Sequence, residues 1–162
     1  MEAIQGLPIS QRKGDWFFVG VFAFFTWSSI FSDGFAALGL IGEGGFWSQA
    51  NAWYAAMGDP FFGADHWWFR ISTAISAFVY GPFYLVLVWA IIKGKNAVRL
   101  PALIYAGMMT HGMTEVLYWE FLNPLGQQPS NLAWFLGWNM PYLVFPILFA
   151  VRVYKPEPFG RA

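Results

Sequence analysis

The stretch ISTAISAFVYGPFYLVLVWAII, residues 71–92, carries no charged side chain and is long enough to cross the hydrocarbon core of a bilayer as a helix. Three further stretches, residues 16–31, 100–122 and 132–153, approach or exceed the ~20 apolar residues that such a crossing requires. Hydrophobic residues make up 57% of the chain and charged residues only 11%, which is far from the composition of soluble proteins. The sequence therefore predicts an all-α membrane protein with a bundle of four transmembrane helices.

The basic residues are distributed unevenly about these four stretches. Of the nine lysines and arginines, all but Arg70 fall on the side where the chain begins and ends. Cytoplasmic loops carry such an excess of positive charge, so both termini of this multi-pass protein are expected in the cytoplasm, in a bacterial inner membrane or the endoplasmic reticulum. We accordingly divide the chain into a cytoplasmic segment (1–15), one membrane domain (16–153) and a cytoplasmic tail (154–162).

A short helix is predicted in the first outer loop, after the glycine-rich residues 39–45. Its aromatic and apolar side chains recur at helical spacing, which indicates a helix that lies in the outer membrane interface. These residues are Phe46, Trp47, Ala50, Trp53, Tyr54 and Met57. Asp59-Pro60 ends this helix, because proline disfavours helical geometry at the preceding residue.

The composition excludes several classes of site. The chain has no cysteine, which removes thiol catalysis, disulfides and cysteine metal ligands. His111 and Glu115 would supply two metal ligands at most, and His66 lies in an interfacial setting, so no metal and no cofactor are expected. The net charge is +0 and the bases are scattered at helix ends, so nucleic acid is not an expected partner.

The third predicted span contains two ionisable residues at a depth where they are costly. His111 lies near the middle of residues 100–122 and Glu115 one helical turn further, so both project from one face. Ionisable groups within a span are by default functional candidates, and such a pair can hold, donate and recover a proton. The alternative is a hydrogen-bonded pair that only fixes helix packing. Glu120 lies nearer the outer end and is predicted to be interfacial.

Each of the other spans also presents one polar face, at mid-depth or toward the outer side. These faces carry Thr26, Ser29 and Asp33 in the first span, Thr73, Ser76 and Tyr80 in the second, and Asn139 and Tyr142 in the fourth. Their convergence predicts a cavity with a polar floor and aromatic walls that opens in the outer half of the bilayer.

Short strings spread along the chain carry a resemblance to a known family. They are Trp53-Tyr54, Asp59-Pro60, Trp68-Phe69, Gly81-Pro82-Phe83-Tyr84, Lys93-Gly94, RLPALIY at 99–105, Glu115-Val116-Leu117-Tyr118 and Asn139-Met140-Pro141-Tyr142-Leu143. In their order and spacing the chain resembles the EXPERA superfamily from the first span to Arg152. That family contains the emopamil-binding protein, a sterol Δ8-Δ7 isomerase, and the sigma-2 receptor. The resemblance implies a four-helix bundle, usually dimeric, with a pocket that lipids can reach.

The resemblance also implies roles for individual residues. Asp33 and Asp59 match two aspartates characteristic of the sigma-2 receptor branch. Asn139 matches a pocket asparagine of the isomerase branch, and Glu115 falls where that branch carries an acidic residue. Tyr142 stands where the isomerase branch has a tryptophan.

The chain departs from the isomerase pattern in its first two spans. Ser29 and Asp33 stand where the isomerase has a His-x-x-x-Glu pair, and Thr73 replaces a glutamate of the following span. Either the proton-handling pair has moved to His111 and Glu115 on the facing helix, or isomerisation has been lost.

Two functions are therefore expected as alternatives. The leading one is sterol or terpenoid double-bond isomerisation, in which His111 and Glu115 donate and accept the proton and Asp33 stabilises the carbocation. Substrate would be bound by Thr73, Ser76, Tyr80, Asn139, Tyr142 and Asp59. The alternative is a non-catalytic protein that binds or moves lipids. The expected partners are a sterol, terpenoid or other lipid, cationic amphiphiles, the bilayer and, by the resemblance, a second copy of the chain in a homodimer.

Overall fold

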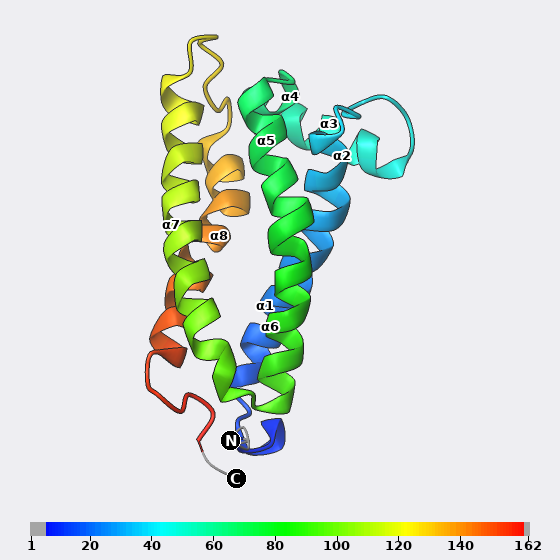
Figure 1. Ribbon diagram of the computed structural model, residues 1–162. Coiled ribbons are helices and arrows are strands. Elements are labelled where there is room, and N and C mark those ends of the chain that lie inside the picture. The colour runs from blue at the N-terminus through cyan, green and yellow to red at the C-terminus, as the bar shows by residue number, and fades with distance from the viewer. Residues whose placement is uncertain (1–5, 161–162) are drawn as a thin grey trace.

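The protein, represented by a computed structural model, is described over residues 6–160, most of which lie in helices (Figure 1). Two long rods each contain a π-helical turn. The first rod is α1 (Asp15–Ser28), the turn Ser29–Asp33 and α2 (Gly34–Ala37); the second is α5 (Trp67–Ile75), the turn Ser76–Tyr80 and α6 (Gly81–Lys93). The other helices are α3 (Phe46–Gly58), α4 (Pro60–Gly63), α7 (Arg99–Leu122) and α8 (Leu132–Val153), with short 3-10 turns at Ile9–Gln11 and Asn96–Val98.

Three segments are long and apolar enough to cross a membrane, namely Asp15–Ala37, Trp67–Lys93 and Leu132–Val153. The first is longer than the predicted span because the helix continues through its π-helical turn. Helix α7 has 24 residues, which is a sufficient length, but it is more polar and is not one of these three. The fourth span therefore stays a prediction, as does the interfacial position of α3.

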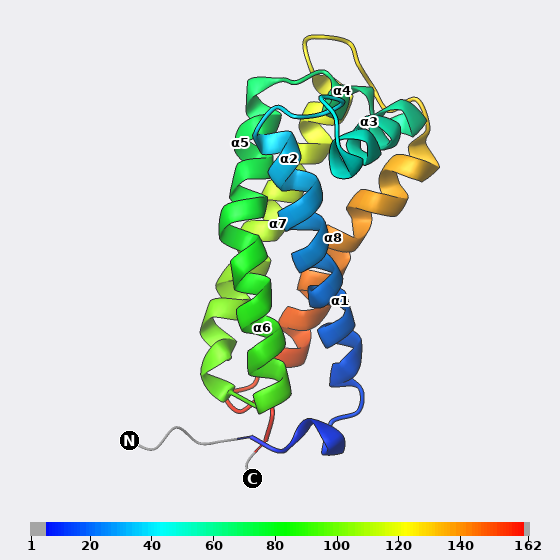
Figure 2. The same cartoon turned by 90° about the vertical axis from the view of Figure 1, so that its right-hand side faces the viewer.

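The two rods run antiparallel and side by side, and α7 pairs with α8 (Figures 1 and 2). Both ends of the described chain lie at one end of the bundle, which we call the terminal end. Helices α2, α3 and α4 lie at the opposite end, which we call the far end. Toward the far end, α8 diverges from the first rod and lies beneath α3 (Figure 2).

The interior of the terminal half is mainly aromatic. Phe22 and Tyr84 are completely buried, and the ring of Phe22 meets that of Phe149 edge to face at 4.9 Å. The outward faces instead carry large apolar side chains such as Phe78, which is 62% exposed, and Trp89, which is 53% exposed. Lipid tails can cover such faces, so the pattern fits helices that pack within a bilayer.

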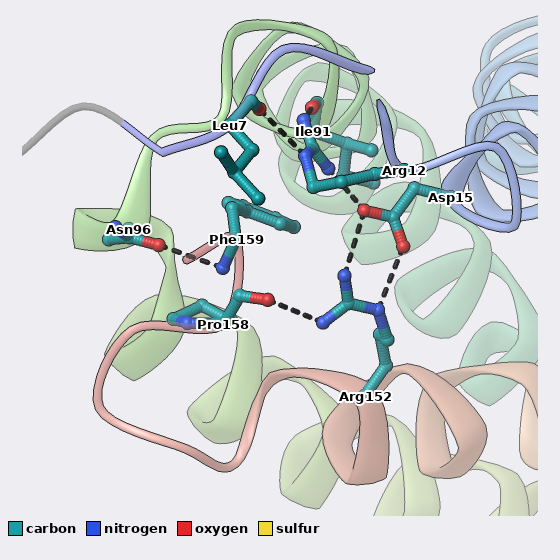
Figure 3. Close-up of polar contacts among 8 residues, drawn as sticks. All are labelled: Leu7, Arg12, Asp15, Ile91, Asn96, Arg152, Pro158 and Phe159. Atoms are coloured by element: carbon teal, nitrogen blue, oxygen red, sulfur yellow. Dashed lines mark hydrogen bonds and ion pairs between the residues drawn. The ribbon is translucent and has the colours of Figure 1, made fainter. Parts of the chain in front are cut away.

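Asp15, at the start of α1, bridges two guanidinium groups at the terminal end (Figure 3). Arg152, near the end of α8, donates from Nε to Asp15 Oδ1 at 2.8 Å and from Nη2 to Oδ2 at 3.0 Å. Arg12 pairs with the same Oδ2 through Nη1 and donates through Nη2 to the carbonyl oxygen of Ile91 at 2.6 Å. The Asp15 carboxylate is buried, and both of its oxygens face a positive group.

The segment after α8 closes this cluster. The Phe159 ring centre lies 4.5 Å from the guanidinium carbon of Arg12 and 5.6 Å from that of Arg152. The backbone N–H of Phe159 donates to Asn96 Oδ1 at 2.9 Å (Figure 3). We call Arg12, Asp15, Arg152 and Phe159 the terminal clamp. It fastens residues from both predicted cytoplasmic segments onto the helices.

Candidate functional site

Two π-helical turns face each other where the two rods meet. In each, a glycine N–H bonds to the carbonyl five residues earlier, Gly34 to Ser29 and Gly81 to Ser76. The Oγ atoms of Ser29 and Ser76 lie 3.0 Å apart and form a hydrogen bond between the rods. Pro82 accounts for the second turn: it has no N–H, so the carbonyl four residues earlier loses its helical donor. Such turns are frequent at functional sites, so the side chains beside them are candidates.

The glycines that follow the two turns let the rods approach closely. A Cβ atom on Gly81 would lie 3.0 Å from Ile30 Cγ1, and one on Gly34 would lie 3.8 Å from Ala77 Cβ. The two contacts correspond to each other, because each glycine packs against the second residue of the opposite turn. The tighter contact is at Gly81, where a side chain would push the turns apart.

Asp33, the last residue of the first π-helical turn, supplies a carboxyl group to this contact. It is half-buried. Its carboxyl interacts with the Ser76 side chain across the rods, and its charge acts on the Tyr142 hydroxyl of α8. The structure thus brings together three residues that the sequence placed on separate polar faces.

Tyr142 connects α8 to α1 at the same level. Its ring stacks on Phe25, with centroids 4.1 Å apart and planes 13° from parallel. Its hydroxyl forms a hydrogen bond with Ser28 Oγ. Because the Ser28 hydroxyl donates to the Phe24 carbonyl oxygen at 3.1 Å, Tyr142 is the donor toward Ser28.

A second polar cluster surrounds Asp59 at the far end. Asp59 is the N-cap of α4, where its Oδ1 accepts the Phe62 N–H at 3.0 Å. Its Oδ2 accepts a hydrogen bond from the Tyr54 hydroxyl at 2.7 Å. Asn139 of α8 donates through Nδ2 to the Tyr54 hydroxyl at 3.1 Å and to the Phe135 carbonyl oxygen at 2.9 Å. We call Tyr54, Asp59 and Asn139 the far-end network.

The pKa values of the two acids in the α3–α5 region are shifted in opposite directions. Burial raises the pKa of the Asp59 carboxyl above its ordinary value of 3.8, although hydrogen bonds from Tyr54 and Phe62 oppose the shift. Burial and the neighbouring Asp59 also raise the pKa of the Tyr54 hydroxyl. Asp65, by contrast, lies at the surface, and its hydrogen-bonded ion pair with Arg70 lowers its pKa.

Glu120 is enclosed by protein, and its predicted depth at the membrane interface stays a prediction. The residue is 0% exposed, and no described residue donates a hydrogen bond to either of its carboxylate oxygens. Its carboxyl interacts with that of Asp59. The adjacent Trp119 ring lies parallel to the Phe61 ring at 6.4 Å, so α4 covers this turn of α7. The position of Glu120 along α7 could not show that another helix, α4, buries it.

His111 and Glu115 lie on one face of α7 as predicted, with Nδ1 of the histidine 3.7 Å from Oε1 of the glutamate. Their side chains are 75% and 52% exposed, so this face points away from the bundle interior. Within residues 6–160, no ion pair or hydrogen bond links the pair to Asp33 or Asp59. Their catalytic role stays a prediction, and the structure does not bring them into either polar cluster.

Two further predicted binding residues have other contacts. Thr73 is buried and donates to the Phe69 carbonyl oxygen at 2.7 Å, so its hydroxyl is used within its own helix. Tyr80 is half-buried, and its ring meets that of Tyr105 at 5.7 Å in the aromatic core. Neither side chain joins the far-end network.

A hollow of about 360 Å³ opens between α1 and α8. It is lined by Phe24, Ala133, Trp134, Gly137, Trp138 and Pro141. It arises where the two helices diverge (Figure 2), and its volume lies within the roughly 300–1,000 Å³ typical of ligand pockets.

The hollow borders both polar clusters. The Tyr54 ring meets that of the wall residue Trp138 at 6.3 Å, and Ser28, which bonds to Tyr142, also bonds to the carbonyl oxygen of the wall residue Phe24. Both amide hydrogens of Asn139 are engaged, and no described residue donates to its carbonyl oxygen. That oxygen is therefore the group that this side chain can offer to a ligand.

A family model described as EXPERA (EXPanded EBP superfamily) matches residues 46–153, more than half of the chain. The matched part includes α3 to α8, with the far-end network, Glu120 and the His111–Glu115 pair. It does not include the first rod, where Asp33 lies in the π-helical turn. Neither a curated protein nor a solved structure matches the chain.

Proposed function

The chain belongs to the EXPERA superfamily, and from this premise we propose that it is an integral membrane isomerase that shifts a double bond in a sterol or terpenoid lipid. The observation that carries the proposal is the hollow between α1 and α8, which has aromatic walls and lies beside two polar clusters. A flat apolar lipid fits walls of this kind, and the carboxyl groups supply the acid that the reaction requires.

In the proposed reaction, an acid gives a proton to one alkene carbon and leaves a carbocation on its neighbour. The carboxylate that this leaves then takes a proton from the carbon on the other side of the cation, which forms the shifted double bond and restores the acid, so atoms and charge balance. Asp33 is the proposed proton-transferring group, with Tyr142 and Ser28 beside it. The faces of Phe24 and Trp138 would stabilise the cation, and the apolar walls would exclude the water that traps it. The Asn139 carbonyl oxygen would accept a hydrogen bond from a lipid hydroxyl.

The His111–Glu115 pair has a different role in this proposal. An ionisable pair that faces lipid within a span is costly, so its outward face favours a protein neighbour. We assign this face of α7 to contact with a second copy of the chain, with α7 as the fourth span and both termini in the cytoplasm. Gly107 on α7 is exposed and has no atom within 4 Å of an added Cβ, which suits close helix approach.

The second candidate is a lipid-binding or trafficking protein that performs no chemistry. It is favoured by the exposure of His111 and Glu115, because the only histidine within the long helices then lies outside the hollow. Both candidates predict lipid and cationic amphiphiles in the same hollow, so binding alone does not separate them.

Turnover in deuterated water separates the two candidates. Membranes that contain the protein are incubated with a pool of sterols and terpenoids, and products are examined by mass spectrometry for one added deuterium. Asp33→Asn should lower turnover by about 10²–10⁴-fold while a neutral lipid still binds, because the general acid is lost. If Glu115→Gln abolishes turnover and Asp33→Asn does not, the assignment to Asp33 is wrong. If no lipid in the pool gains deuterium, the non-catalytic function stands.

A further inference from the structure

We infer that Asp59 and Glu120 share a single proton and form a second acid centre, which the hydroxyl of Tyr54 connects to Asn139 beside the hollow. The two carboxyl groups come from α7 and from the start of α4, which meet where the Trp119 and Phe61 rings lie parallel at 6.4 Å, and they interact inside the protein. Only the use of this proton in turnover rests on the proposed function. The pair itself does not.

Burial requires that the pair keep a proton. Asp59 is 2% exposed and Glu120 is 0% exposed, so water reaches neither group. Two neighbouring carboxyl groups in such a place do not both ionise near neutral pH unless a cation compensates them. Within residues 6–160 no group of three or more acidic or histidine side chains is arranged to hold a metal ion.

Among residues 6–160, the groups around the pair supply hydrogen bonds but no positive charge. Helix α3 contributes the Tyr54 hydroxyl, α4 the backbone N–H of Phe62, and α8 the Asn139 amide behind Tyr54. The bases near the start of α5 are engaged elsewhere. Arg70 forms an exposed ion pair, and His66 accepts a backbone N–H through Nδ1.

The hydrogen bonds also show how the proton is arranged. Each oxygen of Asp59 already accepts a bond, one from Tyr54 and one from Phe62, as an ionised carboxylate does. Glu120 accepts none from any described residue, so its only favourable contact with Asp59 is as a donor. A carboxyl group donates only when it is protonated. Glu120 is therefore the donor and Asp59 the acceptor of the shared proton.

The test follows the Asp59 carboxyl by carbon-13 NMR, with label at Cγ of the aspartates of the whole protein in detergent. In the unsubstituted protein the Asp59 signal should change in two steps as the pH rises, and the upper step marks loss of the shared proton. In Glu120→Gln the upper step should disappear. Glu115→Gln, which changes an exposed glutamate of the same helix, should retain both steps.

Several outcomes would overturn the inference. A single step with the same midpoint in the unsubstituted protein and in Glu120→Gln would do so, as would an upper step that moves with added calcium or a chelator. If Glu120→Gln does not fold, as judged by the Asp15 and Asp65 signals, label at Cδ of the glutamates reads the same upper step from Glu120 in the unsubstituted protein. Because the measurement needs no turnover, two steps in an inactive protein would refute only the proposed function.

Discussion

The two ends of the bundle bury the same chemical group in opposite electrostatic settings. At the terminal end, the Asp15 carboxylate meets the guanidinium groups of Arg12 and Arg152. At the far end, Asp59 and Glu120 are buried equally well and meet no positive side chain of any described residue. A buried carboxylate with two positive partners has no need of a proton, whereas a buried pair of acids without one must retain it.

This difference indicates that the acid at the terminal end stabilises the fold, whereas the acids at the far end are available for chemistry. In the terminal clamp the charged groups are paired with one another and hold distant segments together, and the aromatic core packs next to them. The far end keeps its acids uncompensated, next to a hollow between diverging helices. An acid that holds a transferable proton is useful to a reaction, while a fully paired carboxylate is not.

The largest expected effect is loss of the terminal clamp. Asp15→Asn would leave two guanidinium groups facing each other without their shared anion, and breaking a buried pair in this way costs about 3 kcal/mol. Thermal unfolding in detergent, followed by tryptophan fluorescence, should show the loss. The exposed Asp65–Arg70 pair supplies the control, because Asp65→Asn should be close to neutral. Equal losses in the two variants would remove the contrast between a clamp and a surface pair.

A smaller effect is expected in the pH dependence of stability, where compensated and uncompensated acids have opposite signs. The pKa of the Asp59 carboxyl is raised in the folded state. Its contribution to the free energy of unfolding is therefore complete below pH 3.8, the ordinary pKa of the group, and falls as the pH rises above that value. The pKa of the Asp65 carboxyl is lowered. Its contribution to the free energy of unfolding is therefore complete above its ordinary pKa of 3.8 and is lost as the pH falls. Solvent screens the Asp65 pair, so that slope should be shallow.

The measurement compares melting temperatures across pH for the unsubstituted protein, Asp59→Asn and Asp65→Asn. The stability advantage of the unsubstituted protein over Asp59→Asn should shrink as the pH rises. Its advantage over Asp65→Asn should shrink as the pH falls. If both differences in melting temperature shrink in the same direction of pH, Asp59 has a positive partner and its pKa is not raised.

The smallest effect is expected at Glu120. In Glu120→Gln the amide can donate to Asp59 as the protonated acid did, so the free energy of unfolding should change by less than about 1 kcal/mol. Unfolding under the same conditions as for Asp15→Asn measures it, with Asp65→Asn as the surface baseline. A loss as large as that of Asp15→Asn would show that Glu120 is ionised and that its charge stabilises the fold.

The runs of apolar residues predicted the helices, because the length and polarity of a helix depend on residues that are contiguous in the sequence. Helical spacing likewise placed His111 and Glu115 on one face of α7. It could not say toward which neighbour that face points, since this depends on how α7 packs against α8. The pair therefore lies on the outside, although its residue types are those of a catalytic site.

The features that the sequence did not reveal are made by residues far apart in the chain. Arg152 lies 137 positions from Asp15, and the far-end network joins Tyr54 to Asn139 across 85. Of the paired π-helical turns, the sequence indicates only the second, through Pro82. Their contact depends on how the two rods pack against each other. The burial of Glu120 depends on cover from α4.

The most direct test of the proposed lipid site fills the hollow. Gly137 lines it and has no atom within 4 Å of an added Cβ, so Gly137→Leu should occupy the space without disturbing the helix. Gly20 on α1 is equally open and lies outside the hollow, so Gly20→Leu is the matched control.

Lipid extracted from the three purified proteins would be identified and quantified by mass spectrometry. We expect a sterol or terpenoid in the unsubstituted protein and in Gly20→Leu, and at least about tenfold less of it in Gly137→Leu, a difference of about 1.4 kcal/mol in binding. The same amount of that lipid in all three proteins, or none of that class in any, would contradict it.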